Sequence, residues 1–459
     1  MPAPSSHWLL ERIAEHGEKI ALHAAGGTAT FAQLRAATDR SYARLEDEQV
    51  SSGEVVVLDA DYGIDSLALL LALAANRNVI VPVTGLPVAE VEQRAAIVGA
   101  ARVIQVRQAA TTWQRRPPTG AQPHPMLARL AAEGHAGLVL FSSGSTGRPK
   151  AMVHDFDRLL ESYRERRSRS LTLLVFLLFD HIGGLHTLLT SLASGTTLVI
   201  PQFRDPEHVG AAIARHRVAV LPTSPTFLNL LLLSDAVRRH DLGSLRIISY
   251  GTEPMPDALL RRLRAALPRV KFIQTFGTSE TGIAHTSSKS SDSTLLKLDD
   301  PNVEHRIVDG ELWLRSRTQI LGYLNHASEA FTDDGWFKTG DLVETAEDGF
   351  LRVTGRRSEM INVGGEKVLP GEVESVVLEL PEIVDCVAHG EPSAITGQFV
   401  AVRVVLAPGA DPAAIRKRVR MHCRERLAGY KVPARVDIVP DTGISARFKK
   451  IRRPNPVNP

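Results

Sequence analysis

The sequence contains few cysteines and no long apolar run. Two cysteines, Cys386 and Cys423, are too few for a disulfide framework or a four-thiolate zinc site. The longest apolar runs, 67–75 and 171–179, are nine residues long, whereas a membrane-spanning helix needs about 20. Residues 1–7 carry no basic start, and no apolar stretch follows them. We therefore expect no membrane partner and a reducing, cytoplasmic location.

Lysine is also scarce, and the positive charge is unevenly placed. The formal net charge is +3, but residues 411–459 hold thirteen Arg and Lys against four Asp and Glu, a net charge of +9. A basic terminal region of this kind binds a polyanion, such as nucleic acid, a membrane, a nucleotide cofactor or an acidic protein, or it is simply a solvated surface. No aromatic residue is interleaved with the arginines of 416–426, which disfavours nucleic acid.

What the sequence does contain is typical of a globular protein with more than one domain. Its 459 residues are 44% hydrophobic and 23% charged, which excludes disordered and fibrous classes. From 138 to 282, apolar runs alternate with stretches of helical spacing, a pattern that predicts parallel strands joined by helices in an α/β sheet. The expected strands are 138–141, 171–176, 197–200, 218–221, 245–249 and 271–275. The expected helices are 155–167, 184–193, 206–216, 224–233 and 256–267.

The pattern changes after residue 310. Short strands are expected at 311–315 and 349–354 around a turn-rich stretch at 333–336. A helix at 370–380, strands at 384–389 and 399–406 and a basic helix at 411–427 then predict a small α+β module. We place its boundary near 355–359.

The strongest chemical signal is the stretch LVLFSSGSTGRPK at 138–150. An apolar strand runs into a loop of hydroxylated residues and glycines that ends in Pro149 and Lys150. Glycines let backbone amides approach an anion, hydroxyls add donors and lysine adds charge, so we expect phosphate binding. The spacing fits neither a Walker A loop nor a nucleophile elbow. The candidate phosphate ligands are Ser142, Ser143, Gly144, Ser145, Thr146, Gly147 and Lys150.

This loop closely resembles the signature loop of the adenylate-forming (AMP-binding) superfamily, which includes acyl- and aryl-CoA synthetases. Four further segments resemble that family's motifs in the same order. They are FGTSE at 276–280, GWFKTGD at 335–341, GRRSEMINVGGEKVLPGEVE at 355–374 and ISARFKKIRR at 444–453. Fainter matches occur at 28–34 and 71–82. The resemblance implies a large N-terminal α/β domain at 1–356 that binds ATP and the acyl group, a hinge at 357–359, and a small mobile α+β domain at 360–459.

The resemblance also assigns the nucleotide site. Glu280 would be the magnesium ligand, which suits a hard carboxylate oxygen. Phe276 would pack on adenine, and Asp341 would accept hydrogen bonds from the ribose. The remaining ATP-binding residues by resemblance are Gly251, Thr252, Glu253, Gly277, Ser279 and Arg356.

The acyl group is expected beside His181, which stands in the stretch FDHIGG at 179–184. Asp180 departs from the apolar or small residue that family members carry there. It could orient the His181 ring, face an amine on the substrate, or be a solvated carboxylate. The other residues expected to line the acyl pocket are Thr223, Ser224, Phe227 and Tyr250.

The C-terminal match leaves two candidates for the catalytic lysine. Lys450, with the residues after it, fits the family pattern Lys-Ile-x-Arg, and we expect it to stabilise charge on the reacting carboxylate and α-phosphate. Lys449 then stands where family members have glycine, and it is the alternative. Ser358 occupies the hinge position, where many members have aspartate or lysine.

Together these residues predict an acid–thiol ligase that uses ATP and Mg²⁺. A small carboxylic acid, aryl or medium-sized, would attack the α-phosphate, release pyrophosphate and form an acyl-adenylate. The acyl group would pass to coenzyme A, or to the phosphopantetheine of an acidic carrier protein acting in trans, or to an amine, as in secondary metabolism. The alternative of another class is a non-catalytic protein of the same fold that binds ATP or an acyl ligand.

Overall fold

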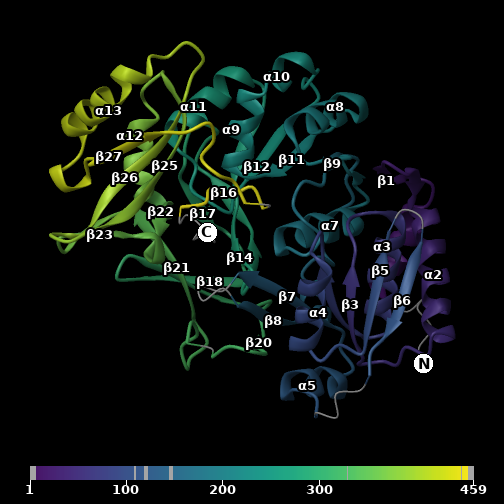
Figure 1. Ribbon diagram of the computed structural model, residues 1–459. Coiled ribbons are helices and arrows are strands. Elements are labelled where there is room, and N and C mark those ends of the chain that lie inside the picture. The colour runs from purple at the N-terminus through teal and green to yellow at the C-terminus, as the bar shows by residue number, and fades with distance from the viewer. Residues whose placement is uncertain are drawn as a thin grey trace.

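The computed structural model describes residues 7–107, 110–117, 122–143, 148–327, 329–445 and 447–452. Two seven-stranded sheets form the larger part of the molecule (Figure 1). In the first sheet, all neighbouring strands are parallel except the edge pair β1–β2. Its strands, in spatial order, are β13 (Lys271–Gln274), β12 (Ile247–Tyr250), β11 (Val220–Thr223), β9 (Thr172–Leu174), β10 (Thr197–Val199), β1 (Ile20–Ala24) and β2 (Gly27–Thr30).

The second sheet contains the strand that precedes the signature loop. Its spatial order is β20 (Gly322–Tyr323), β8 (Pro149–Asp155), β7 (Gly137–Ser143), β4 (Val79–Val83), β3 (Val55–Asp59), β5 (Arg102–Val106) and β6 (Thr111–Arg115). The pair β7–β8 is antiparallel, so the loop joins the two strands of a hairpin. The strand expected at 138–141 is thus confirmed, but it lies in a different sheet from the strands that follow it.

Helices fill the space between the two sheets and cover their outer faces. One apolar cluster joins both sheets to α1 (Trp8–His16), α2 (Phe31–Asp47), α3 (Ile64–Ala75) and α7 (Ile182–Ser194). A second covers the far face of the first sheet with α8 (Pro206–His216), α9 (Pro225–Leu233), α10 (Ala236–Arg239) and α11 (Asp257–Ala266). A third covers the far face of the second sheet with α4 (Val88–Ile97) and α5 (Pro125–Glu133). The short helix α6 (Phe156–Glu161) follows β8.

The period of two along each strand produces this layering. In the first sheet, Leu173 and Leu198 pack into the inner cluster, whereas their neighbours Leu174 and Val199 pack into the outer one. Because successive side chains of a strand point to opposite faces, a continuous apolar run can bury both faces of a sheet. The strands therefore read as unbroken apolar stretches rather than as alternating ones.

A third, antiparallel sheet lies between these layers and the C-terminal part. Its order is β16 (Thr286–Ser288), β17 (Leu296–Leu298), β22 (Leu351–Arg356), β21 (Phe337–Thr345), β19 (Glu311–Ser316) and β18 (Val303–Val308). A short ladder of β14 (Phe276–Thr278) and β15 (Gly282–Ala284) precedes it. The turn η2 (Glu347–Gly349) joins β21 to β22.

The C-terminal part has a sheet and a core of its own. The sheet runs β24 (Glu366–Val368), β23 (Ile361–Val363), β26 (Gly397–Leu406), β25 (Ile383–Ser393), and β27 (Arg435–Ile438) adds to β26. It packs with α12 (Pro370–Val377) and α13 (Pro412–Arg426) in a separate apolar cluster, and η4 (Gly429–Lys431) precedes β27. The turn η3 (Arg357–Glu359) joins it to β22. A large α/β part with a small C-terminal part is the fold class that the sequence predicts, while a hinge at 357–359 and the mobility of the small part stay predictions.

The C-terminal segment, defined here as residues 447–452, contacts both the first sheet and the C-terminal sheet. None of the helices in the described ranges is both long and apolar enough to cross a membrane.

Candidate functional site

A cavity of about 540 Å³ opens where the sheets and the C-terminal segment meet. The carboxyl ends of β11, β12 and β13 border it, as expected for a ligand site in an open α/β sheet. Residues of α7, β21, β22 and the C-terminal segment complete the wall. The site is therefore assembled from parts of the chain that lie far apart in sequence, from Ser142 to Arg452.

Most of the site residues predicted from the sequence line this cavity. They are Ser142, Lys150, His181, Thr223, Gly251, Thr252, Glu253, Phe276, Gly277, Ser279, Glu280, Asp341, Arg356 and Lys450. Gly144, Ser145, Thr146 and Gly147 lie outside the described residues, and only the backbone of Ser143, the last residue of β7, is described.

The residues predicted to hold phosphate and magnesium gather at one end of the cavity. Ser142 and Lys150 face each other across the β7–β8 ladder. The Lys150 ammonium lies 5.8 Å from the centre of the Tyr323 ring, and the Tyr323 hydroxyl donates to Glu280 Oε1 over 3.0 Å. A lysine, a serine hydroxyl and a carboxylate are thus brought to the mouth of the hairpin loop.

Glu280 fits the role of a magnesium ligand. Within the described ranges, only Oε1 of its carboxylate has a side-chain partner, so the second oxygen is available. Magnesium in nucleotide sites is held by one or two carboxylates together with substrate phosphates, so a single available carboxylate is enough. The one cluster of three ligand-type residues found in the described chain, Glu133 with His135 and Asp155, lies elsewhere.

The predicted ribose ligand Asp341 is buried and paired with Arg356. Asp341 lies on β21, opposite Arg356 on β22, and the Arg356 Nε donates to Asp341 Oδ1 over 2.8 Å. Burial raises the pKa of the Asp341 carboxyl, and the Arg356 charge opposes that shift. The ion pair fixes the carboxylate in the cavity wall and leaves Oδ2 to accept from a ligand hydroxyl.

The stretch from Gly251 to Glu253 follows β12 at the cavity wall. A Cβ atom on Gly251 would lie 2.9 Å from the Thr275 carbonyl oxygen, so only glycine fits this close approach. The Glu253 carboxylate does not point freely into the cavity: it accepts from the backbone amide of Thr226 over 2.8 Å and from that of Lys450 over 3.5 Å.

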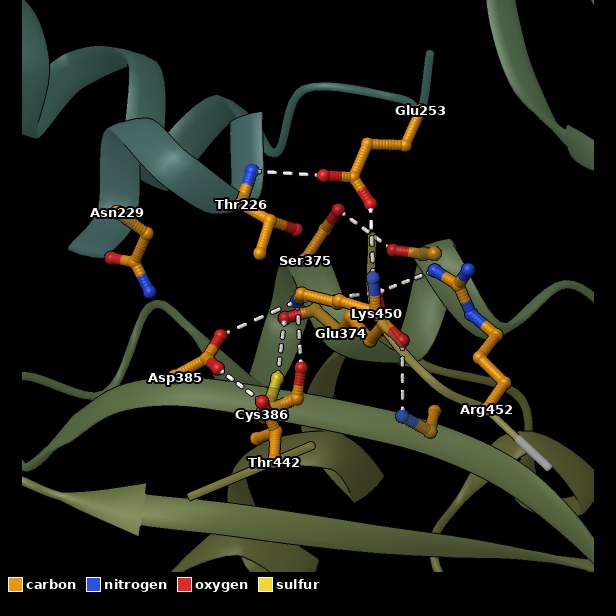
Figure 2. Close-up of polar contacts among 12 residues, drawn as sticks. Thr226, Asn229, Glu253, Glu374, Ser375, Asp385, Cys386, Thr442, Lys450 and Arg452 are labelled. Carbon is orange, nitrogen blue, oxygen red and sulfur yellow. Dashed lines mark hydrogen bonds and ion pairs between the residues drawn. The ribbon is translucent and has the colours of Figure 1, made fainter. Parts of the chain in front are cut away.

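The two adjacent lysines of the C-terminal segment have opposite surroundings. The Lys450 ammonium donates to the Cys386 carbonyl oxygen over 2.7 Å and lies 3.4 Å from Asp385 and 3.7 Å from Glu374 (Figure 2). Burial alone would lower the pKa of Lys450, but Glu374 and Asp385 outweigh it and raise the pKa. Lys450 is therefore held inside the C-terminal part by an ion-pair network.

Lys449 faces the cavity and has no carboxylate partner among the described residues. Burial, and then the positive charges of Arg356 and Arg447, lower its pKa, while Glu253 and Asp341 act in the opposite direction. A buried ammonium near two arginines, with no anion paired to it, marks a place that an anionic ligand would occupy. Lys450 lines the cavity, but its ammonium is ion-paired inside the C-terminal part, whereas Lys449 has no such pair among the described residues. This difference favours the alternative, Lys449, and the choice between the two lysines stays a prediction.

Phe448 bears on the choice between Lys449 and Lys450. Its φ of 51° lies in the left-handed region that favours glycine, so Phe448 occupies the glycine position that the resemblance placed at Lys449. The centre of its ring lies 4.8 Å from the ring centre of Phe176 and 5.5 Å from that of Phe227. Aromatic packing holds a backbone conformation that would otherwise be unfavourable, and the family pattern is displaced by one residue.

His181 begins α7 and lines the cavity. Its Nδ1 accepts from the backbone amide of Gly183 over 3.2 Å, which caps the helix and leaves the proton of the neutral ring on Nε2. Burial, and then the charges of Arg447 and Lys449, lower the pKa of His181 to about 3. The ring is neutral at pH 7 and can donate a hydrogen bond.

Four residues expected in the acyl pocket do not line the cavity. Asp180 is buried between Arg94, 3.7 Å away, and Arg447, 4.0 Å away. Ser224 caps α9 and donates to the Phe448 carbonyl oxygen over 2.8 Å. Phe227 and Tyr250 are buried in the outer core of the first sheet. Tyr250 follows Ser249, which does line the cavity, and alternation along β12 sends the tyrosine to the other face.

Ser358 lies in η3, outside the cavity wall. Its place between β22 and β23 agrees with the expected position of a hinge, and the hinge itself stays a prediction.

The sequence reasoning missed several residues of the cavity wall. On α7 they are His186, Thr187 and Thr190, which the spacing after Gly183 could have revealed, because residues three, four and seven apart share one helix face. Gln274, Glu359 and Arg452 also line the cavity. Glu359 and Arg452 lie inside the family motifs at 355–374 and 444–453, which could have revealed them, whereas no motif contains Gln274.

Comparison with known proteins gives the family context. A family model described as AMP-binding enzyme matches residues 9–324, and one described as AMP-binding enzyme C-terminal domain matches residues 372–449. These matches confirm the resemblance that the motifs predicted.

Two curated relatives are similar over much of the chain. A 4-coumarate–CoA ligase-like protein of Oryza sativa is 31% identical over 383 residues, 73% of this chain and 62% of the relative. A 2-succinylbenzoate–CoA ligase of Bacillus licheniformis is 32% identical over 322 residues, 65% of each chain. The matched region thus spans slightly less than two thirds of each relative.

Solved structures agree over nearly the whole chain. The amide bond synthetase McbA of Marinactinospora thermotolerans is 25% identical with a TM-score of 0.74, and the match covers 97% of both chains. The anthranilate CoA ligase AuaEII has a TM-score of 0.80 at 21% identity, covering 98% of this chain and 97% of that one, and it shows the shared fold.

Proposed function

Because the chain belongs to the AMP-binding enzyme family, we propose that it activates a carboxylic acid with ATP. The acid's carboxylate attacks the α-phosphorus, pyrophosphate leaves, and an acyl-adenylate remains bound. The acyl group then passes to a thiol, and we favour coenzyme A as the acceptor. The named CoA ligases among its relatives support this proposal.

The observation that carries the proposal is the gathering of complementary groups around one cavity. Lys150, Ser142 and Glu280 meet at one end, the buried Asp341 pairs with the half-exposed Arg356 beside it, and Lys449 faces them from the C-terminal segment. The oxygens of phosphate and of a reacting carboxylate need hydrogen-bond donors and cations. The ribose hydroxyls need an acceptor. The wall supplies each of these.

We assign the catalytic cation to Lys449. Negative charge develops on the oxygens between the carboxylate and the α-phosphate as the bond forms, and a fixed ammonium in a buried site stabilises that charge. Within the described ranges Lys449 forms no ion pair with a carboxylate, whereas Lys450 has two carboxylates close by. The His181 Nε2–H would orient the acid's carboxylate. We assign Phe276, Gly277, Ser279 and Gly251 to the nucleotide contacts that the resemblance implies.

Glu280 would hold Mg²⁺ together with the phosphates of ATP. When bound, the ion neutralises phosphate charge and favours departure of pyrophosphate. The Tyr323 hydroxyl orients the Glu280 carboxylate for this task.

The cavity residues indicate the acceptor of the acyl group less closely than they indicate the adenylation step. A carrier-bound phosphopantetheine and an amine are the alternatives to coenzyme A, and a structural neighbour named as an amide bond synthetase supports the amine. Transfer would follow a rotation of the part after η3, about Ser358. We expect this chemistry in the cytoplasm.

Acid-dependent exchange of labelled pyrophosphate into ATP tests the proposal. We expect exchange with a subset of aryl and aliphatic acids, and its loss in Lys449→Ala. Once an acid is known, coenzyme A, a carrier protein and amines are compared by product mass. No exchange with any acid, together with measured ATP binding, would favour a non-catalytic binding protein.

A further inference from the structure

The end of the cavity that lies along α7 has a distinctive chemistry. Gly183, His186, Thr187 and Thr190 present one face of the helix to the cavity. Thr190 stands seven positions after Gly183, so this helical wall is about 10 Å long. Apolar residues complete this end: Leu173, Leu177, Ile182, Val220, Pro222 and Ile283.

Two threonine hydroxyls at this end have no hydrogen-bond partner among the described residues. Thr223 is 2% exposed, and its Oγ1 is buried without a partner. The Thr190 Oγ1 is likewise buried and unpaired. Thr187 differs, because its Oγ1 donates to the Gly183 carbonyl oxygen over 2.9 Å. Buried polar groups in folded proteins are nearly always paired, so unpaired hydroxyls in a cavity wall point to a polar group on the ligand.

His186 adds a hydrogen-bonding ring on the same helix face, and Tyr163 holds this ring in place. The Tyr163 hydroxyl lies 3.0 Å from His186 Nδ1. Burial lowers the pKa of His186 to about 4, so the ring is neutral at pH 7. Since its Nδ1 is hydrogen-bonded to the phenol, the neutral ring presents Nε2 to form a hydrogen bond with a ligand.

Among the residues that the structure describes, no charged side chain lines this end of the cavity. The charged residues of the wall lie elsewhere. They belong to the strands β8, β21 and β22, to the turns that follow β12, β14 and β22, and to the C-terminal segment. Asp180, the one carboxylate that the sequence placed near the acyl group, is held between Arg94 and Arg447 and does not line the cavity. An ammonium or a second carboxylate on the acyl group would be desolvated here without a counter-charge.

We propose that the acid carries an uncharged hydrogen-bonding substituent, a hydroxyl or an aryl amine, which Thr190, Thr223 and His186 recognise. This inference rests on the proposed function, because it specifies the acid that the cavity activates. It makes α-amino acids and dicarboxylic acids poor substrates.

Matched sets of aryl acids test the inference. Each set contains the unsubstituted acid, its hydroxy and amino positional isomers, and isomers with a carboxylate or an aminomethyl group. The measured quantity is kcat/KM in pyrophosphate exchange. We expect at least one hydroxy or amino isomer to exceed the unsubstituted acid by about tenfold, the size of one buried hydrogen bond made or missed, and the charged isomers to rank last.

The threonines provide matched variants. Thr190→Val and Thr223→Val each remove an unpaired hydroxyl, and we expect at least one of them to reduce the preference to about twofold or less. Thr187→Val removes a hydroxyl that is already paired, on the same helix face, and should leave the preference ratio in place. A wild-type ratio near one for every isomer, or a ratio that neither Thr190→Val nor Thr223→Val changes, would overturn the inference.

A binding measurement separates this inference from the proposed function. Acyl-sulfamoyl adenosines are stable mimics of acyl-adenylates and need no turnover. If no acid supports exchange, the proposed function fails, and the Kd ratio between hydroxylated and unsubstituted mimics still tests the cavity. A tenfold ratio that Thr190→Val or Thr223→Val removes supports the inference, and equal affinities refute it.

Discussion

Replacing each of the two adjacent lysines in turn should produce two different defects. In Lys449→Ala the reacting oxygens lose a preorganised cation. Removal of one such group costs about 10²- to 10³-fold in rate, or about 2.7–4 kcal/mol of transition-state stabilisation. Folding stability should not fall, because the Lys449 ammonium has no carboxylate partner among the described residues and lies near Arg356 and Arg447.

Lys450→Met should leave catalysis nearly intact and weaken the fold. The variant keeps most of the aliphatic chain but leaves Glu374 and Asp385 without the ammonium that lies 3.7 and 3.4 Å from them. Breaking a buried ion pair costs about 3–5 kcal/mol. Arg452 remains on Glu374 and the Thr442 hydroxyl remains on Asp385, so we expect a loss near the lower end of that range, at about 3 kcal/mol.

The assay pairs pyrophosphate exchange with thermal unfolding for both variants. Exchange is measured at a temperature where each variant is folded, with the acid that the wild-type enzyme activates. The expected result is low exchange with normal stability for Lys449→Ala, and near-normal exchange with a lowered Tm for Lys450→Met. The reverse pattern would refute the assignment and return the catalytic role to Lys450.

The remaining predictions concern pH, the nucleotide site and the docking of the C-terminal segment. The pKa of His186 is lowered to about 4 in the folded protein, below its ordinary 6.5, so the unfolded chain binds more protons between these values. The His186 contribution to stability therefore falls by about 1.4 kcal/mol per pH unit as the pH drops from 6.5 to 4, and His186→Gln should reduce that slope in denaturant titrations. Asp341→Ala should raise the KM for ATP by roughly ten- to a hundredfold, because a charge-assisted hydrogen bond to a ligand hydroxyl is lost. Glu280→Gln should raise the Mg²⁺ concentration needed for half-maximal exchange, because an amide oxygen is a weaker ligand than a carboxylate. Phe448→Ala should weaken docking of the C-terminal segment, because a large aromatic contact is lost, and faster amide hydrogen exchange across 447–452 would report it.

Each of these predictions has a result that would contradict it. An acid slope that His186→Gln leaves unchanged would mean that other groups carry the pH dependence. An unaltered KM for ATP in Asp341→Ala would remove that carboxylate from the nucleotide site. A Mg²⁺ requirement that Glu280→Gln does not shift would assign the ion to other ligands. Unchanged protection in Phe448→Ala would show that the ion pairs of Lys450 and Arg452 hold the segment without the ring.

Much of the fold could be predicted from local sequence patterns. The strands and helices expected between 171 and 275 are present within a few residues, and so are the helices and strands of the C-terminal part. The helix expected at 155–167 is shorter, since α6 ends at Glu161. The assignment of β7 to a second sheet could not be predicted, because an apolar run buries both faces equally well in either sheet.

Some residues of the candidate site could likewise be predicted from local sequence, and others could not. Hydroxyls, glycines and charges at family spacing identified the phosphate loop, Glu280 and Asp341, since those groups act through local backbone and their own side chains. Residues such as Phe227 and Tyr250 were placed wrongly, because whether a strand or helix residue faces a ligand or the core depends on what packs against the other side.

The sequence by itself therefore determined the family and many of the helices and strands, and it supplied the residues of the proposed nucleotide site. Only the tertiary structure distinguished Lys450, whose ammonium is ion-paired inside the C-terminal part, from Lys449, which has no such pair among the described residues. Adjacent residues of an extended segment point in opposite directions, and the packing of Phe448 against the first sheet fixes which direction each takes. The tertiary structure also decided that Asp180 is ion-paired with Arg94 and Arg447, which come from distant parts of the chain. It likewise decided that the described residues at the α7 end of the cavity are polar but uncharged.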